Sequence, residues 1–271
     1  MKSITVVLYG PSGCGKSTLA RRLCKCGFNR IQQLTTREPV VYSGSHPGVV
    51  IDERKLGEYD FVSELHFLKL LEKGAFAEMM EFDKTQGDVR KRVAYGSLAW
   101  EYNAPGFHVV TTNIEGAAQL AANSELESEM IFVEFVVPRA SIILKATSRG
   151  RDSLEEVMLR SVNEKKLYYV SSKWDVFPEG YMPDIILYED DTKDAVSFMF
   201  GRYPFEPYFA DDDSFADDDT TISKMLWERT RPYWYTEGEH PNLAEVMDST
   251  AAEILEYVAN RFGSMVEPQE G

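Results

Sequence analysis

A glycine-rich stretch, GPSGCGKST at residues 10–18, constrains the fold of this chain more than any other feature. It follows a short apolar run at residues 3–10, whose β-branched side chains predict a strand buried on both faces. After it, apolar residues recur at helical spacing, and Gly27 is suited to end that helix. Strand, glycine-rich turn and helix are the context in which the pattern G-x-x-x-x-G-K-[ST] binds phosphate.

The residue types in this loop predict a site for a nucleoside triphosphate. Glycines let backbone N–H groups converge on a phosphate, and the following helix N-terminus adds a favourable dipole. Lys16 is placed to reach the β- and γ-phosphates, and the Ser17 hydroxyl to ligate Mg²⁺. The candidate nucleotide-binding residues are Gly10, Ser12, Gly13, Cys14, Gly15, Lys16, Ser17 and Thr18. The motif alone does not separate kinases from GTPases and motor proteins.

Beyond the loop, strands alternate with helices, which favours an α/β fold with a parallel, doubly wound sheet. Apolar runs predict strands near residues 31–34, 77–84, 91–100, 106–113, 129–138 and 183–191. Helices are predicted within residues 61–74, 139–150, 152–170 and 192–200. The first of these has Leu65, Leu68 and Leu71 on one face and Gly74 as its stop. Residues 40–58 are expected to form a loop.

Composition narrows the class of protein. A chain of 271 residues with 44% hydrophobic residues can form one α/β core with an appendage. No apolar run approaches the roughly 20 residues of a membrane helix, and the N-terminus does not resemble a signal peptide. The three cysteines, an odd number, suggest a reducing compartment, so we expect a cytoplasmic protein without membrane partners.

The net charge of −15 lies mostly in the C-terminal part of the chain. Residues 201–271 hold 16 acidic against 5 basic side chains, which predicts an acidic linker followed by a helical extension. The helix is expected to pack through Ala252, Ile254, Leu255, Val258 and Phe262. Such an acidic chain is a poor electrostatic partner for DNA, although a local basic groove could still bind it.

The order of motifs over residues 1 to about 200 resembles the guanylate kinase family. The resemblance rests on GPSGCGKST, LTTREP, YDFVS, GAFAEMMEF, YGS, NIEGA, RGRDSLEEVMLR and YEDDTKDA. It implies a P-loop kinase fold with a parallel core sheet at residues 1–200. It also implies a small subdomain for the nucleoside monophosphate at about 35–100, a lid at about 148–160, and ATP with Mg²⁺ as cofactors.

The resemblance also assigns roles to individual residues. The lid supplies Arg149, Arg151 and Arg160, which together with Lys16 are the candidate catalytic residues. Arg37, Tyr59 and Tyr95 match the residues that hold the acceptor phosphate. Glu78 matches the carboxylate that accepts from the two donors of guanine, and Ser97 matches the hydroxyl that faces guanine O6.

Four positions depart from the family pattern. Val40 replaces a second phosphate-binding arginine, and Thr111 and Asn113 replace two aspartates. Gln33 stands where a small hydroxyl residue is expected, and the segment between Arg37 and Tyr59 carries an insertion. We hypothesise that Arg54 or Lys55 from this segment replaces the missing charge.

The favoured function is ATP-dependent phosphoryl transfer to a small nucleotide, GMP or dGMP. One alternative keeps the reaction and changes the acceptor to another deoxynucleotide, ribose bisphosphate or a hydroxymethylated pyrimidine in DNA. Another is a binding module without catalysis, which is disfavoured because Lys16, Ser17, Arg149 and Arg160 are all present.

Overall fold

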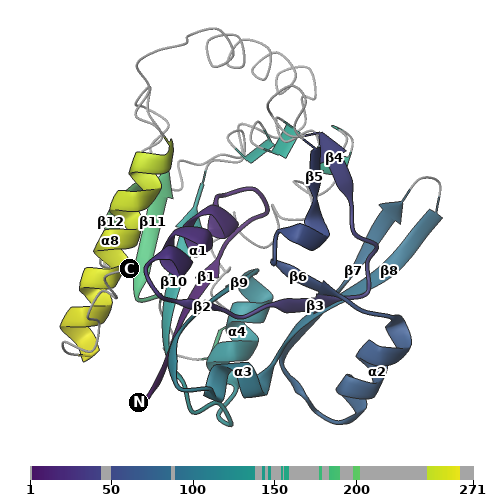
Figure 1. The fold of residues 1–271 in the computed structure, drawn as a ribbon, viewed down its shortest axis with the longest axis horizontal. Coiled ribbons are helices and arrows are strands. Elements are labelled where there is room, and N and C mark those ends of the chain that lie inside the picture. Colours follow the sequence, from purple (N-terminus) through teal and green to yellow (C-terminus); the bar gives the residue numbers. More distant parts are fainter. Residues whose placement is uncertain are drawn as a thin grey trace, which may run out of the picture.

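A central sheet with the strand order β12-β11-β10-β1-β9-β2 organises the protein (Figure 1). Its strands are β1 (Ser3–Tyr9), β2 (Asn29–Arg30), β9 (Gly106–Thr112), β10 (Glu129–Val136), β11 (Ile185–Glu189) and β12 (Phe198–Gly201). All pairs are parallel except β11 with β12. The computed structural model describes residues 2–43, 50–86, 89–137, 142–143, 146–147, 154, 156–158, 177–178, 183–189, 198–201 and 243–262.

Strand β1 is buried on both faces, as its sequence predicts. Ile4, Val6 and Leu8 face one core that includes α1 (Lys16–Lys25) and α8 (Leu243–Phe262). Val7 and Tyr9 face a second core that includes α3 (Ala99–Asn103) and α4 (Ile114–Ala122). Because successive side chains of a strand point to opposite faces, β1 joins both helix layers to the sheet. None of the described helices has the length and apolar character needed to cross a membrane.

A second sheet, with the order β6-β3-β8-β7, forms the smaller subdomain. It contains β3 (Gln33–Thr35), β6 (Tyr59–Phe61), β7 (Phe76–Gln86) and β8 (Val89–Leu98), and it is accompanied by α2 (Glu64–Glu72). Strands β7 and β8, predicted as two short strands, are longer than expected and pair in one antiparallel hairpin. Leu34, Phe67 and Ala94 make its small core.

The loop expected in this subdomain is wrong in part, and the leucine face of α2 is not the face that packs. Residues 40–58 are not all loop, since β4 (Val41–Ser43) pairs with β5 (Val50–Asp52) and a 3₁₀ turn, η1 (Glu53–Lys55), follows. Leu65, Leu68 and Leu71 are not the packed face of α2, because their exposed fractions are 64%, 46% and 41%. The helix packs instead through Phe67, whose ring stacks on Phe76.

The helix predicted at residues 192–200 is also wrong in its described part. Phe198–Gly201 is the strand β12, antiparallel to β11. Pairing with an existing strand edge overrides the local helical pattern there. The helices predicted at 139–150 and 152–170 fall largely outside the described residues, as do the two aspartate triplets.

The predicted C-terminal helix is confirmed as α8, and it packs on α1 in the core that carries the phosphate loop. Ala251, Ile254 and Val258 are buried, whereas Ala252, expected on the packed face, is exposed. Arg261 forms an ion pair with Asp184 beside β11, which fixes the end of the helix. The division of the chain at residue 200 stays a prediction, and α8 shows that the chain beyond it contributes to the same core.

Replacing Ile254 with alanine should destabilise the whole protein by about 2–4 kcal/mol, because it leaves a cavity between α8 and α1. Urea unfolding followed by circular dichroism measures this loss. Ala252→Ser, on the exposed side of the same helix, is the matched control and should cost about 0.5 kcal/mol. Equal stability of the Ile254 variant and the wild type would mean that α8 does not belong to the cooperative core.

Candidate functional site

The phosphate loop lies at the carboxyl end of β1 and leads directly into α1. Gly10, Gly13 and Gly15 have φ angles of 151°, 93° and 108°, a region that side chains other than glycine rarely adopt. A Cβ atom on Gly10 would lie 2.8 Å from the Cβ atom of Phe135 on β10. The glycine spacing is therefore required by both the backbone conformation and the packing beneath the loop.

Lys16 lies at the first position of α1, with its ammonium group against the loop. Its Nζ donates hydrogen bonds to the carbonyl oxygens of Gly10 at 2.7 Å and Pro11 at 2.8 Å. The N–H of Thr18 donates to the carbonyl of Gly15 at 3.0 Å, whereas the N–H groups of Lys16 and Ser17 have no partner within the helix and point to the place where an anion binds. This arrangement is suited to a polyphosphate.

A polar chain connects the loop to the smaller subdomain. The Ser17 hydroxyl donates to Oε2 of Glu58 at 3.3 Å. Oε1 of Glu58 lies 4.0 Å from Nη1 of Arg30, whose Nη2 donates to Oγ1 of Thr111 at 3.4 Å. The sequence did not single out Glu58 or Arg30, because neither belongs to a motif.

The Ser17 hydroxyl and the Glu58 carboxylate suit a magnesium ion held mainly by a nucleotide. The residues that the structure describes include no cluster of three or more His, Cys, Asp or Glu side chains able to hold a metal. At phosphate sites Mg²⁺ takes one or two protein oxygens and completes its shell with phosphate oxygens and water. Ser17 with the Glu58 carboxylate beside it fits that requirement.

Strand pairing brings the three candidate phosphate-binding residues of the acceptor site together. Thr35, two residues before Arg37, is paired with Tyr95, and the Tyr59 and Tyr95 rings meet edge-on at 5.8 Å. The Arg37 guanidinium lies 4.9 Å from the centre of the Tyr59 ring. Burial opposes the charge of Arg37, but the hydrogen bond to Glu53 and the nearby Tyr95 hydroxyl outweigh it and raise the pKa of Arg37.

The candidate base-binding residues form a second, fully buried group. Oε1 of Glu78 accepts from the Ser97 hydroxyl at 2.8 Å and from Nε2 of Gln33 at 3.1 Å. The Tyr102 hydroxyl lies 2.7 Å from Ser97 Oγ and, since Ser97 donates to Glu78, acts as the donor. Burial raises the pKa of Glu78 above the ordinary glutamate value, although the bonds from Ser97 and Gln33 lower it.

The other carboxylate oxygen of this group is left without a partner. Among the described residues, Oε2 of Glu78 and Oγ1 of Thr112 are buried and accept or donate no hydrogen bond. Both oxygens face Gly116, on which a Cβ atom would lie 2.8 Å and 2.1 Å from them. A buried carboxylate oxygen without a donor costs free energy, so such an atom calls for a donor from a ligand or an ordered water.

The positions that depart from the family pattern have defined places in the structure. Gln33 is bonded to Glu78, and the backbone N–H of Val40 donates to Glu53 at 2.9 Å. Asn113 caps α4 by accepting from the N–H of Gly116 at 2.8 Å. Thr111 accepts from Arg30, as described above.

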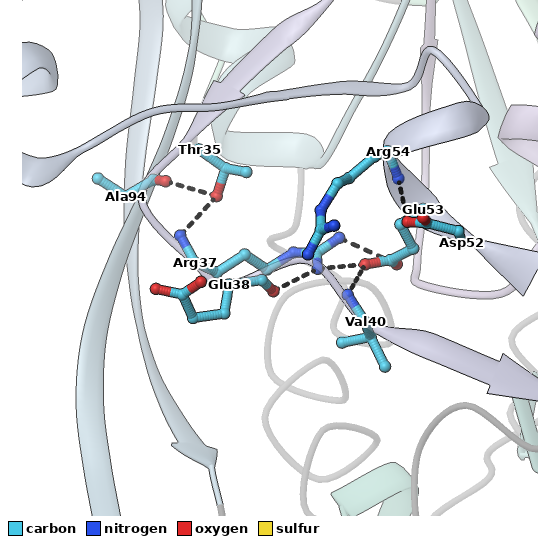
Figure 2. Close-up of polar contacts among 8 residues, drawn as sticks. All are labelled: Thr35, Arg37, Glu38, Val40, Asp52, Glu53, Arg54 and Ala94. Carbon is cyan, nitrogen blue, oxygen red and sulfur yellow. Dashed lines mark hydrogen bonds and ion pairs between the residues drawn. The ribbon is translucent and has the colours of Figure 1, made fainter.

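Glu53 is the functional candidate that the sequence missed in this region. Its carboxylate contacts Arg37 (Figure 2), as the paired atoms show. Arg54 and Lys55, proposed from the sequence to replace the missing arginine, are exposed. That replacement stays a hypothesis. Arg149, Arg151 and Arg160 lie outside the described residues, so their catalytic roles also stay predictions.

The chain is similar to several guanylate kinases. It is 30% identical to that of Oleidesulfovibrio alaskensis over 173 residues, covering 60% of this chain and 72% of the relative. It is 28% identical to that of Ruegeria pomeroyi over 194 residues, covering 70% and 79%. With the guanylate kinase of Anaeromyxobacter dehalogenans it shares 28% identity over 167 residues, which is 59% of this chain and 64% of that protein, just under two thirds of its length.

Two further comparisons add no detail. No family model matches the chain. A solved guanylate kinase structure from Anaplasma phagocytophilum aligns over 97% of each chain at 12% identity, but its TM-score of 0.38 is too low to bear on the fold. The family assignment therefore rests on the sequence relatives: this chain belongs to the guanylate kinase family.

Proposed function

We propose that this protein transfers the γ-phosphoryl group of ATP to a nucleoside monophosphate, GMP or dGMP. The observation that carries the proposal is the buried Glu78 carboxylate, which has one oxygen without a partner in the same subdomain as Arg37, Tyr59 and Tyr95. Family membership supports the same reaction.

The donor half of the reaction belongs to the phosphate loop. Lys16 and the N–H groups at the start of α1 bind the β- and γ-phosphates. Ser17 and the adjacent Glu58 supply oxygen atoms suited to Mg²⁺. When bound, the metal offsets negative charge on the phosphates. The lid arginines are proposed to approach the transferring group from the other side.

The acceptor half holds the monophosphate in line with the γ-phosphorus. Arg37 supplies N–H donors, and Tyr59 and Tyr95 supply hydroxyl groups to its oxygens. One acceptor oxygen attacks the γ-phosphorus, the bond to the β,γ-bridging oxygen breaks, and ADP leaves. Little covalent chemistry is asked of the protein, so positioning accounts for most of the rate.

Glu78 provides the preference for guanine. An ionised carboxylate only accepts hydrogen bonds, and guanine presents two adjacent donors, N1–H and the 2-amino group, whereas adenine does not. Oε2 of Glu78 lacks a donor within the described residues and is the atom we assign to this contact. A buried acceptor left unpaired by the wrong base explains strong discrimination.

Two features favour a changed acceptor as the second candidate. Gln33 already bonds one oxygen of Glu78, and Val40 stands where the family pattern has a second phosphate-binding arginine. Both reduce what the site offers to GMP. The acceptors to set against GMP are therefore other deoxynucleotides, ribose bisphosphate and DNA with hydroxymethylated pyrimidine.

An ADP-release assay with Mg-ATP across these acceptors tests the function. Turnover is expected with GMP or dGMP and with no other member of the panel. Turnover only with another acceptor would mean that Gln33, Val40, Thr111 and Asn113 rebuild the pocket. A protein that neither turns over an acceptor nor gains thermal stability with Mg-ATP would be a binding module instead.

A further inference from the structure

A buried ion pair fixes the arginine of the acceptor site. Nη1 of Arg37 lies 2.5 Å from Oε2 of Glu53, and Nη2 lies 3.1 Å from Oε1, so the contact is bidentate (Figure 2). The two side chains are only 5% and 3% exposed. A planar guanidinium matched to both oxygens of a carboxylate has one orientation, unlike a singly bonded arginine.

Glu53 also fixes the turn that carries Arg37. Its Oε2 accepts from the backbone N–H of Val40 at 2.9 Å, and its own N–H donates to the carbonyl of Val40 at 3.2 Å. Glu53 lies at the start of η1, directly after β5. Glu53 therefore links the segment between Arg37 and Tyr59 to the turn that carries Arg37.

The remaining surroundings of Arg37 leave it little freedom. Its Cζ atom lies 4.9 Å and 5.2 Å from the ring centres of Tyr59 and Phe61 on β6. Nη1 donates a second hydrogen bond to the carbonyl of Glu38 at 3.2 Å. Of the five N–H groups of a guanidinium, three are thus used by described residues, which leaves one on Nη2 and the one on Nε for an acceptor.

The acceptor site carries less positive charge than a site with two unpaired arginines. Val40 is uncharged, and the negative charge of the Glu53 carboxylate offsets the positive charge of Arg37. An acceptor phosphate held here depends on directed hydrogen bonds from Arg37, Tyr59 and Tyr95 more than on net positive charge. Its affinity is then sensitive to the orientation of Arg37.

We infer that Glu53 is a positioning residue that sets the affinity for the acceptor by holding Arg37 in its buried orientation. The inference rests on the proposed function, because it takes Arg37 as a ligand of the acceptor phosphate. The contacts of Glu53 that carry this role are those to Arg37 and to the backbone of Val40, both on the acceptor side. It therefore affects the acceptor side and not the ATP side.

The test compares Glu53→Gln with Glu38→Gln in the full-length protein. The glutamine at 53 keeps the size of the side chain but turns an NH₂ group toward the guanidinium, so one charge-assisted bond is lost. We expect the KM for GMP to rise about 10-fold while the KM for ATP is unchanged, the scale of one such bond. Glu38→Gln, the same change on an exposed neighbour in the turn, should match the wild type.

A conservative variant separates positioning from general stability. Glu53→Asp keeps the carboxylate and should recover part of the affinity for GMP, even where it melts at a lower temperature than the wild type. If Glu53→Gln does not fold, the KM ratio between GMP and ATP is read from this variant. A lower KM for GMP would mean that Glu53 competes with the acceptor, and an unchanged KM would mean that it only supports the fold; either overturns the inference.

The same assay keeps the two proposals apart. A wild type that neither binds nor phosphorylates GMP or any other acceptor of the panel overturns the proposed function, and the role of Glu53 with it. A wild type that phosphorylates GMP, with no rise in the KM of the Glu53 variants, overturns only the role of Glu53.

Discussion

Replacing Glu78 with glutamine is expected to make the protein more stable and nearly unable to use GMP. The carboxylate is buried, and its Oε2 has no hydrogen-bond partner among the described residues. In the variant, the amide oxygen can accept from Ser97 and Gln33 as before. The new NH₂ group faces the region of Gly116, where Oγ1 of Thr112 also lacks a partner.

The stability gain of this variant should depend on pH in a defined direction. Burial raises the pKa of Glu78 above its ordinary value of 4.5, so the native protein disfavours the ionised form. At a pH below that ordinary pKa, the Glu78 side chain is neutral in both the folded and the unfolded chain, so the cost of burying an ionised carboxylate vanishes. As the pH rises through the raised pKa the wild type loses stability and the glutamine variant does not.

Thermal melts of both proteins between pH 4 and 8 measure this difference. A gain of about 1–3 kcal/mol is expected at neutral pH, the usual cost of a buried group without a partner. Glu81→Gln, on the exposed side of the same strand, removes only an exposed ion pair with Arg92 and should change stability by less than about 1 kcal/mol.

The same variant should lose activity with GMP by about 10⁴-fold in kcat/KM, because a site built around two hydrogen bonds is left without the charge that accepts them. A stabilised variant that still phosphorylates GMP would show that the base is recognised elsewhere. A loss of both stability and activity would indicate that Glu78 supports the fold, with no ligand of its own.

Replacing Lys16 with alanine is expected to lower kcat/KM by about 10³-fold with every acceptor. Lys16 Nζ is held at the loop by the carbonyls of Gly10 and Pro11, so the ammonium group is already where the phosphates bind. Removing a preorganised charge from a phosphoryl-transfer site typically has an effect of this size. ADP release at saturating acceptor and varied Mg-ATP measures it, as kcat/KM for ATP.

Lys25→Ala, in the last turn of the same helix, is the matched control because that side chain is exposed. It should retain full activity. The Lys16 variant should also gain less thermal stability with Mg-ATP than the wild type. Wild-type activity without Lys16 would mean that the loop does not hold the transferring phosphate.

Local sequence patterns determined the core of this protein. The β-branched run of β1, the glycine spacing of the loop and the apolar spacing of α1 each specify their own conformation, because these preferences act over a few residues. The hairpin of β7 and β8 and the helix α8 follow in the same way from period and turn residues. The acceptor-binding roles proposed for Arg37, Glu78 and Ser97 could also be predicted from the sequence, since the motifs around these residues lie in short stretches.

Only the tertiary structure decided which faces and which partners these elements have. The leucines of α2 have helical spacing, yet Phe67 is the residue that packs, because a period defines a face without saying what covers it. Residues 198–201 form a strand because β11 offers an edge. The pairing of Glu53 with Arg37 joins residues 16 positions apart that no motif links. Such contacts depend on how separate elements meet in space, and local propensity carries no information about that.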